Sequence, residues 1–181
     1  MVTLIFESHA TSLDNEAGIA SGDFDVALST VGESQAKALG ERYRNQEFAA
    51  VFCSDLQRSY RTGELAFAGR PFPVLKDKRL RECDYGDFTR RASSEVERCR
   101  GNYIEEPFPG GQSYQQTTEL MKSFLTDVLS QYNGKTVLVI GSRATQYGLE
   151  NVINDVPLRK TVTAAWQWQP GWTYKLDAIK N

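Results

Sequence analysis

The 181-residue sequence has a single histidine, His9, and only three cysteines. One histidine excludes every site that needs a second one in the same chain, such as paired metal ligands at helical spacing or a two-histidine relay. The cysteines Cys53, Cys83 and Cys99 are odd in number and have no close-spaced pair, so they predict neither a disulfide framework nor a zinc knuckle. We interpret them as free thiols in a reducing cytoplasm, and we expect no metal site.

The sequence also lacks an excess of charge of one sign and a long apolar run near its start. Lys and Arg total 21 against 23 for Asp and Glu, a net charge of −2, which gives no electrostatic case for binding nucleic acid or a membrane surface. The first apolar run ends at Phe6, before Glu7, and is too short for a signal peptide or a spanning helix. We therefore expect a soluble, cytoplasmic protein with neither nucleic acid nor membrane as a partner.

Short β-favouring apolar runs alternate with helical patterns along the chain. We predict strands at 2–6, 49–53, near 74–75 and at 136–140, and helices at about 30–45, 55–67, 117–132 and after 143. Thr30 and Glu33 have the form of a capping box that opens the first helix, and Asp55 can cap the second.

Two later segments have different patterns. Residues 80–113 are charged and end in a Pro- and Gly-rich stretch, which predicts an inserted loop with a short helix over the site. Residues 162–168 alternate apolar and polar side chains, turn at Pro170-Gly171, and are followed by a second aromatic run at 172–176. We interpret them as an aromatic hairpin that closes a sheet edge, in preference to a platform on which a ligand stacks.

The order of these elements predicts a single domain over residues 1–181, an α/β fold built as a three-layer α/β/α sandwich with a mostly parallel sheet. Open sheets of this kind bind ligands at the carboxyl ends of their strands. Polar residues gather after the predicted strand ends, namely Ser8, His9 and Asn15, then Arg58, then Glu82, and finally Ser142 and Arg143. An imidazole, a guanidinium, a carboxyl group and a helix N-terminus can surround one tetrahedral anion, which predicts a phosphate site.

These residues belong to longer motifs that occur in order along nearly the whole chain. The motif positions are His9, Ser12, Asn15, Gly22, Asp25, Leu28, Ser29, Gly32, Gln35, Ala36, Ser54, Asp55, Leu56, Arg58, Thr62, Leu80, Glu82, Tyr85, Gly86, Pro109, Gly110, Gly111 and Ser113. In this pattern the chain resembles the histidine phosphatase superfamily, the phosphoglycerate mutase-like proteins. The resemblance implies that family's sandwich fold.

The resemblance also implies phosphoryl transfer through a phosphohistidine, without a metal or another cofactor. His9 would be the nucleophile, with its far ring nitrogen held by a hydrogen bond so that the attacking nitrogen carries no proton. Arg58 would grip the phosphoryl oxygens, and Glu82 would act as general acid to the leaving oxygen and then as general base to water. Asn15 would also contact the substrate, a small phosphorylated metabolite or anion.

Two positions depart from the family pattern. Ser8 stands where the family has an arginine before its nucleophile, and Ser142 stands where it has a second catalytic histidine. A serine can donate a hydrogen bond but brings no positive charge to the phosphoryl group, and losing one preorganised donor typically costs ~10²–10³ in rate. The chain is therefore predicted to be a divergent member with reduced activity, in which Ser8 and Ser142 still line the site.

Nearby cations could compensate for these losses. Arg143 follows Ser142, and Arg81, Arg90 and Arg91 flank the acid segment. We interpret the last three as solvated surface residues, whereas for Arg143 both alternatives stay open.

Three functions remain open from the sequence. The first is a metal-independent phosphatase, with mutase activity less expected because isomerisation of a phosphorylated acid needs a richly basic pocket. The second is a catalytically impaired pseudoenzyme that binds a ligand or a partner. The third is a site that uses His9 and Glu82 for acid–base chemistry on an unphosphorylated metabolite. A homodimer is also left open.

Overall fold

The computed structural model describes residues 1–179, and its centre is a five-stranded sheet of order β3-β2-β4-β1-β5. β3, β2, β4 and β1 run parallel to one another, while β5 pairs with β1 in the antiparallel direction at the edge of the sheet. The predicted mostly parallel sheet is confirmed. The strands are β1 (Val2–Ser8), β2 (Ala50–Cys53), β3 (Val74–Lys76), β4 (Thr136–Gly141) and β5 (Trp172–Leu176).

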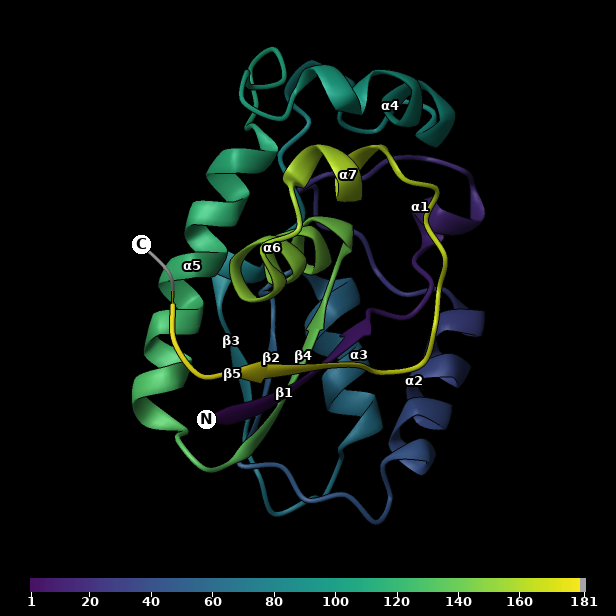
Figure 1. Ribbon diagram of the computed structural model, residues 1–181. Helices are drawn as coiled ribbons and strands as arrows, with labels where there is room; N and C mark the ends of the chain where they lie inside the picture. Colours follow the sequence, from purple (N-terminus) through teal and green to yellow (C-terminus); the bar gives the residue numbers. More distant parts are fainter. Residues whose placement is uncertain (180–181) are drawn as a thin grey trace.

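The central strand β4 shows why the fold has three layers. Its residues from Val137 to Ile140 are fully buried, and successive side chains of a strand point to opposite faces of a sheet. Val137 and Val139 belong to one core cluster, together with Phe124 of α5 (Tyr114–Gln131). Leu138 and Ile140 belong to another cluster beneath α2 (Thr30–Arg42) and α3 (Gln57–Ala66). Helices therefore cover both faces of the sheet (Figure 1).

The helices agree with the predicted ranges, although two start signals were wrong. The N-cap of α2 is Ser29, whose side chain accepts a hydrogen bond from the Gly32 amide, so Thr30 is the first helical residue. The third helical position is then glycine, which has no side chain to complete a capping box. Asp55 does not cap α3, because its carboxylate accepts two hydrogen bonds from Arg81 instead. The helices are α1 (Leu13–Glu16), α2 (Thr30–Arg42), α3 (Gln57–Ala66), α4 (Ser93–Cys99), α5 (Tyr114–Gln131), α6 (Arg143–Asn154) and α7 (Leu158–Thr163), with short 3₁₀ turns η1 (Lys78–Leu80), η2 (Gly86–Phe88) and η3 (Arg100–Asn102).

The segment between β3 and α5 packs over the carboxyl ends of the strands, as the sequence predicted. Its side chains form a separate apolar cluster with residues of α6 and α7, including Phe108, Tyr147 and Val162. Figure 1 shows α4 stacked beyond α7, at the end of the molecule toward which the parallel strands point. Within the described residues, no helix combines the length and the apolar character needed to cross a membrane.

The predicted aromatic hairpin is wrong. Val162 lies in α7, and residues 164–170 form neither helix nor strand. Trp166 uses its ring to pack against Tyr147 and Trp172, with ring centroids 6.4 and 5.6 Å apart, so it covers the end of α6 instead of pairing in a ladder. Only the second half of the pattern is a strand, and β5 closes the sheet edge by pairing with β1.

Candidate active site

One cavity of about 270 Å³ lies at the carboxyl ends of β1 and β4. All of the predicted site residues line it: Ser8, His9, Asn15, Arg58, Glu82, Ser142 and Arg143. β1 and β4 are parallel neighbours in which Ser8 pairs with Gly141. The residues that follow the two strands, His9 and Ser142, therefore lie at the same edge of the sheet. Their convergence is a structural finding, and their chemical roles remain predictions.

His9 follows β1, and hydrogen bonds from its own backbone amide and from the next one hold it in place. Its amide donates to the Gly141 carbonyl at 2.8 Å, and the next amide, of Ala10, donates to Thr62 Oγ1 at 3.0 Å. The ring Nδ1 lies 2.8 Å from the Ala10 carbonyl oxygen. A carbonyl can only accept, so Nδ1 carries the proton of the neutral ring and Nε2 has a free lone pair.

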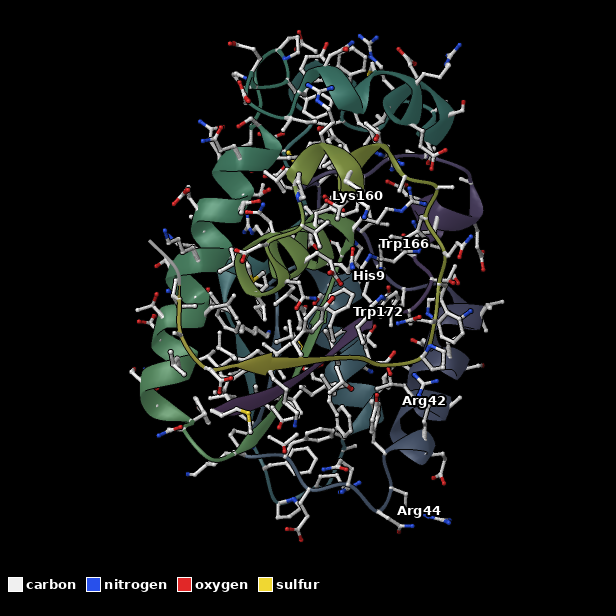
Figure 2. The ribbon with its side chains drawn as sticks, viewed as in Figure 1. His9, Arg42, Arg44, Lys160, Trp166 and Trp172 are labelled. Atoms are coloured by element: carbon white, nitrogen blue, oxygen red, sulfur yellow. The ribbon has the colours of Figure 1, made fainter. Side chains whose placement is uncertain are left out.

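Burial, together with a smaller effect of the nearby charge of Arg58, lowers the pKa of His9 from 6.5 to about 4. Both effects disfavour the imidazolium form. His9 is therefore neutral at pH 7, which is the form that a nucleophilic imidazole requires. Figure 2 shows His9 near the centre of the molecule, beyond the end of β1.

Arg58 lies in the first turn of α3 and is almost fully buried, with 3% of its surface exposed. Its Nη1 donates to the Phe24 carbonyl at 2.8 Å and its Nη2 to the Gly22 carbonyl at 2.6 Å. These neutral acceptors fix the plane of the guanidinium without neutralising it. A guanidinium has five N–H donors, so others remain for an anion in the cavity.

Glu82 is also buried and is positioned by backbone amides. Its Oε1 accepts from the Cys83 amide at 2.8 Å, and its Oε2 accepts from the Ala144 amide at 3.4 Å. The latter amide is in the first turn of α6, where the helix dipole favours a negative charge. The carboxyl group thus lies beside Ser142, the residue that precedes α6.

The two serines that replace family residues differ in their surroundings. Ser8 Oγ is buried and has no hydrogen-bond partner within residues 1–179. Ser142 caps α6, its amide donating to Thr145 Oγ1 at 3.1 Å with the two hydroxyl oxygens 3.4 Å apart. Neither hydroxyl supplies a positive charge.

Arg143 lines the cavity, but it is already paired. Its Nη1 lies 2.8 Å from Glu97 Oε1, and its guanidinium carbon is 5.5 Å from the centre of the Trp166 ring. These contacts hold the side chain and offset its charge.

The other three candidate cations do not line this cavity. Arg81 pairs with Asp55 and Asp23, Arg90 with Asp14, and Arg91 with Glu95. This agrees with their interpretation as surface residues.

Asn15 lines the cavity, and its side-chain amide is partly engaged in hydrogen bonding within the protein. Its Oδ1 accepts from the Ser12 amide at 3.1 Å, and its own backbone amide donates to Ser12 Oγ at the same distance, which forms the capping box of α1. The side-chain NH₂ group is the part left for a ligand, because its oxygen is engaged.

Glu7 lies on β1 just before Ser8 and His9, and its side chain packs against the end of α2. Tyr43 Oη donates to Glu7 Oε1 at 2.6 Å and Arg42 Nη2 donates to the same atom at 2.9 Å. Desolvation by burial raises the pKa of Glu7. The carboxylate of Glu7 is therefore engaged by Arg42 and Tyr43. Glu7 does not line the cavity that Arg58 and Glu82 share with His9, although it borders a second cavity beside His9.

The sequence did not predict several residues of the cavity wall. Arg100, Tyr147 and Trp166 all line it, together with Tyr114 and Trp168. Arg100 stands in a charged stretch without a motif, and the tryptophans had been assigned to a strand. Within residues 1–179, no cluster of three or more His, Cys, Asp or Glu side chains could hold a metal ion.

Known proteins resemble this chain in sequence and in fold. The chain is 30% identical to phosphoserine phosphatase 1 of Hydrogenobacter thermophilus over 169 residues, covering 88% of this chain and 80% of that protein. It is also 30% identical over 148 residues to a probable phosphoglycerate mutase, GpmB, of Erwinia tasmaniensis, covering 77% and 69%. The solved structure of Bacillus stearothermophilus YhfR superposes with a TM-score of 0.81 at 23% identity, covering 93% and 87% of the two chains.

The model of the histidine phosphatase superfamily (branch 1) matches residues 4–163. That range includes all of the predicted site residues, the whole of β4 and all but the first two residues of β1. This chain belongs to the histidine phosphatase superfamily.

Proposed function

We propose that this chain is a phosphohydrolase that moves the phosphoryl group of a small phosphorylated metabolite to His9 and then to water. The observation that carries the proposal is the 2.8 Å hydrogen bond from His9 Nδ1 to the Ala10 carbonyl. It leaves Nε2 unprotonated on a residue that shares a cavity with Arg58 and Glu82. Relatives that are named phosphatases support the same reaction class.

In the first step, Nε2 of His9 attacks phosphorus and forms an N–P bond while the ester P–O bond breaks. Glu82, in its acid form, gives its proton to the leaving oxygen, which departs as an alcohol. Arg58 donates hydrogen bonds to the phosphoryl oxygens as charge shifts onto them. In the second step, Glu82 takes a proton from water, whose oxygen forms a P–O bond while the N–P bond breaks. Inorganic phosphate leaves and the free imidazole returns.

We propose that the reaction is slower than in members with the full motif. Ser8 and Ser142 bring no positive charge, and Arg143 is offset by Glu97. Each lost donor costs ~10²–10³ in rate, and losses within one site do not add. The chain nevertheless keeps a neutral imidazole and a buried guanidinium at the strand ends, which supports a residual phosphatase.

The substrate is small in this proposal. Ligand pockets commonly measure about 300–1,000 Å³, and a cavity of about 270 Å³ is slightly smaller than that range. We propose hydrolysis in preference to a mutase reaction because the cavity also holds the carboxyl groups of Glu82 and Glu97, and Glu97 already pairs with Arg143, so the cavity is less basic than isomerisation of a phosphorylated acid requires.

Trapping of the intermediate tests this function. The protein is mixed with a panel of small phosphomonoesters labelled with radioactive phosphate and quenched in alkaline detergent, which preserves phosphohistidine. We expect labelled protein and free phosphate from the natural sequence and neither from His9→Asn. Absence of both label and turnover across the panel would contradict the proposal.

A binding function without turnover is the second candidate. The buried Ser8 Oγ without a partner and the paired Arg143 favour it, because both mark a weakened phosphate site. Calorimetric binding of a phosphomonoester that the protein never hydrolyses would support this candidate instead.

A further inference from the structure

Arg100 is a buried cation that the proposed reaction does not use. It begins η3, in the segment inserted between β3 and α5, and only 7% of its surface is exposed. Its Nη1 donates to Tyr147 Oη at 3.2 Å and its Nη2 donates to the Ala164 carbonyl at 2.8 Å. Both acceptors are neutral, so they orient the guanidinium and leave its charge uncompensated.

The guanidinium also has an unused donor. Its Nε is buried and has no hydrogen-bond partner in the described part of the chain. No salt bridge found within residues 1–179 includes Arg100, whereas the neighbouring Arg143 is paired with Glu97. A buried charge and a buried N–H group are both costly to leave unpaired, and an anion bound beside them relieves both costs.

The position of Arg100 indicates where in the cavity such an anion would bind. Arg100 lines the same cavity as His9, yet it comes from the inserted segment and is anchored to α6 and to the residue after α7. Figure 1 shows this segment stacked beyond α7, whereas His9 follows the end of β1. The cavity therefore has cations on two different walls, Arg58 beside His9 and Arg100 on the inserted segment.

We propose that Arg100 binds a second anionic group of the substrate, a carboxylate or a second phosphate, while the phosphoryl group lies at His9. This assignment rests on the proposed function, because it takes a phosphomonoester as the ligand of the cavity. A planar guanidinium matches either oxyanion through paired N–H donors. The substrate class is then a small phosphomonoester with two anionic ends.

Two matched pairs of probes test this assignment. Phosphoserine and phosphoethanolamine differ only in a carboxylate, and propane-1,3-diyl bisphosphate and propyl phosphate differ in a second phosphate. The kcat/KM for each probe is measured with the natural sequence and with Arg100→Met. We expect a preference for the doubly anionic member of at least one pair, and a fall of that preference by about 10- to 100-fold in Arg100→Met. The pair that responds identifies the anion.

Binding separates this inference from the reaction itself. Calorimetry with the same probes on His9→Asn, with and without Arg100→Met, needs no turnover. If no probe is hydrolysed but the binding preference depends on Arg100, the phosphatase proposal fails and the assignment of Arg100 stands. If neither binding nor kcat/KM shows a preference that depends on Arg100, the assignment is overturned even when the protein is an active phosphatase.

Control variants account for structural damage. Arg98→Met removes an exposed arginine of α4 that does not line the cavity, and it should leave the preference unchanged. Arg100→Lys keeps the charge but loses the paired donors, so its preference should fall less than that of Arg100→Met. If Arg100→Met fails to fold, Arg100→Lys decides: an unchanged preference overturns the proposal, and a reduced one supports it.

Discussion

Restoring the two missing cationic groups should increase phosphatase activity. The variants are Ser8→Arg, Ser142→His and the double variant. Among residues 1–179, Ser8 Oγ has no hydrogen-bond partner, so its removal breaks no hydrogen bond in the described part of the fold. A second cavity of about 440 Å³ also borders Ser8, His9 and Arg42, and it offers room for a longer side chain.

The expected gain follows from the chemistry of the site. Each restored donor should raise kcat by ~10²–10³, equivalent to about 2.7–4 kcal/mol of transition-state stabilisation. The combined gain should be smaller than the product, because both groups would act on the same phosphoryl oxygens. Ser142→His loses only the 3.4 Å hydroxyl contact with Thr145, since the 3.1 Å bond to Thr145 Oγ1 comes from the backbone. Its cost in stability should be about 1 kcal/mol or less.

Steady-state release of phosphate from a panel of phosphomonoesters measures the gain, and the phosphohistidine trap shows where it arises. Ser34→Arg is the matched control, because it adds a charge on an exposed position of α2 away from the cavity. No gain in a folded double variant would refute the argument that missing positive charge limits the rate. Loss of an existing activity would instead favour acid–base chemistry on an unphosphorylated metabolite.

Three further predictions concern the site and the core. The pKa of His9 is lowered from 6.5 to about 4, so the unfolded chain binds more protons between these values; the free energy of unfolding should fall by about 2–3 kcal/mol as pH falls from 6.5 to 4. Denaturant titrations should show this dependence and lose it in His9→Asn, and equal slopes in both proteins would contradict the assignment. Arg58→Met should lower kcat by ~10²–10³. The control Arg81→Met changes an arginine outside the cavity and should change kcat by less than about 3-fold. Equal losses of kcat in the two variants would mean that Arg58 has no special contact with the substrate. Phe124→Ala in the core should lower the free energy of unfolding by about 3–5 kcal/mol, measured by thermal or denaturant unfolding. Leu120→Ala, at a 39% exposed position of the same helix, should lower it by less than about 1 kcal/mol. Similar losses in the two variants would contradict the assigned packing.

The repeated strand and helix patterns were sufficient to predict the layers of the fold. The run at 137–140 is apolar at every position, which is typical of a strand covered on both faces, and β4 lies in the middle of the sheet. The residues predicted to cap the helix starts were less reliable, because a side chain that could cap a helix can instead bind a residue far away in the sequence. Asp55 illustrates this, since it binds Arg81, a residue 26 positions away.

The aromatic segment near the C-terminus was predicted incorrectly for a related reason. Alternation of apolar and polar residues describes a strand only if a partner strand is available. Residues 164–170 instead lie beside α6 and the cavity, where Trp166 packs against Tyr147. The tertiary contact overrode the local pattern.

For the site, the sequence by itself determined which residues follow the strand ends, and in parallel strands these ends share one edge. His9, Arg58, Glu82 and Ser142 could therefore be predicted as neighbours from the sequence, and all of them line one cavity. The side chains that modify the site were decided by the tertiary structure alone. Glu97 reaches Arg143 across 46 positions of sequence, and Arg100 meets the Ala164 carbonyl across 64. Pairing and burial over such separations depend on how the inserted segment packs against α6 and α7, and these contacts decide which cation remains for a ligand.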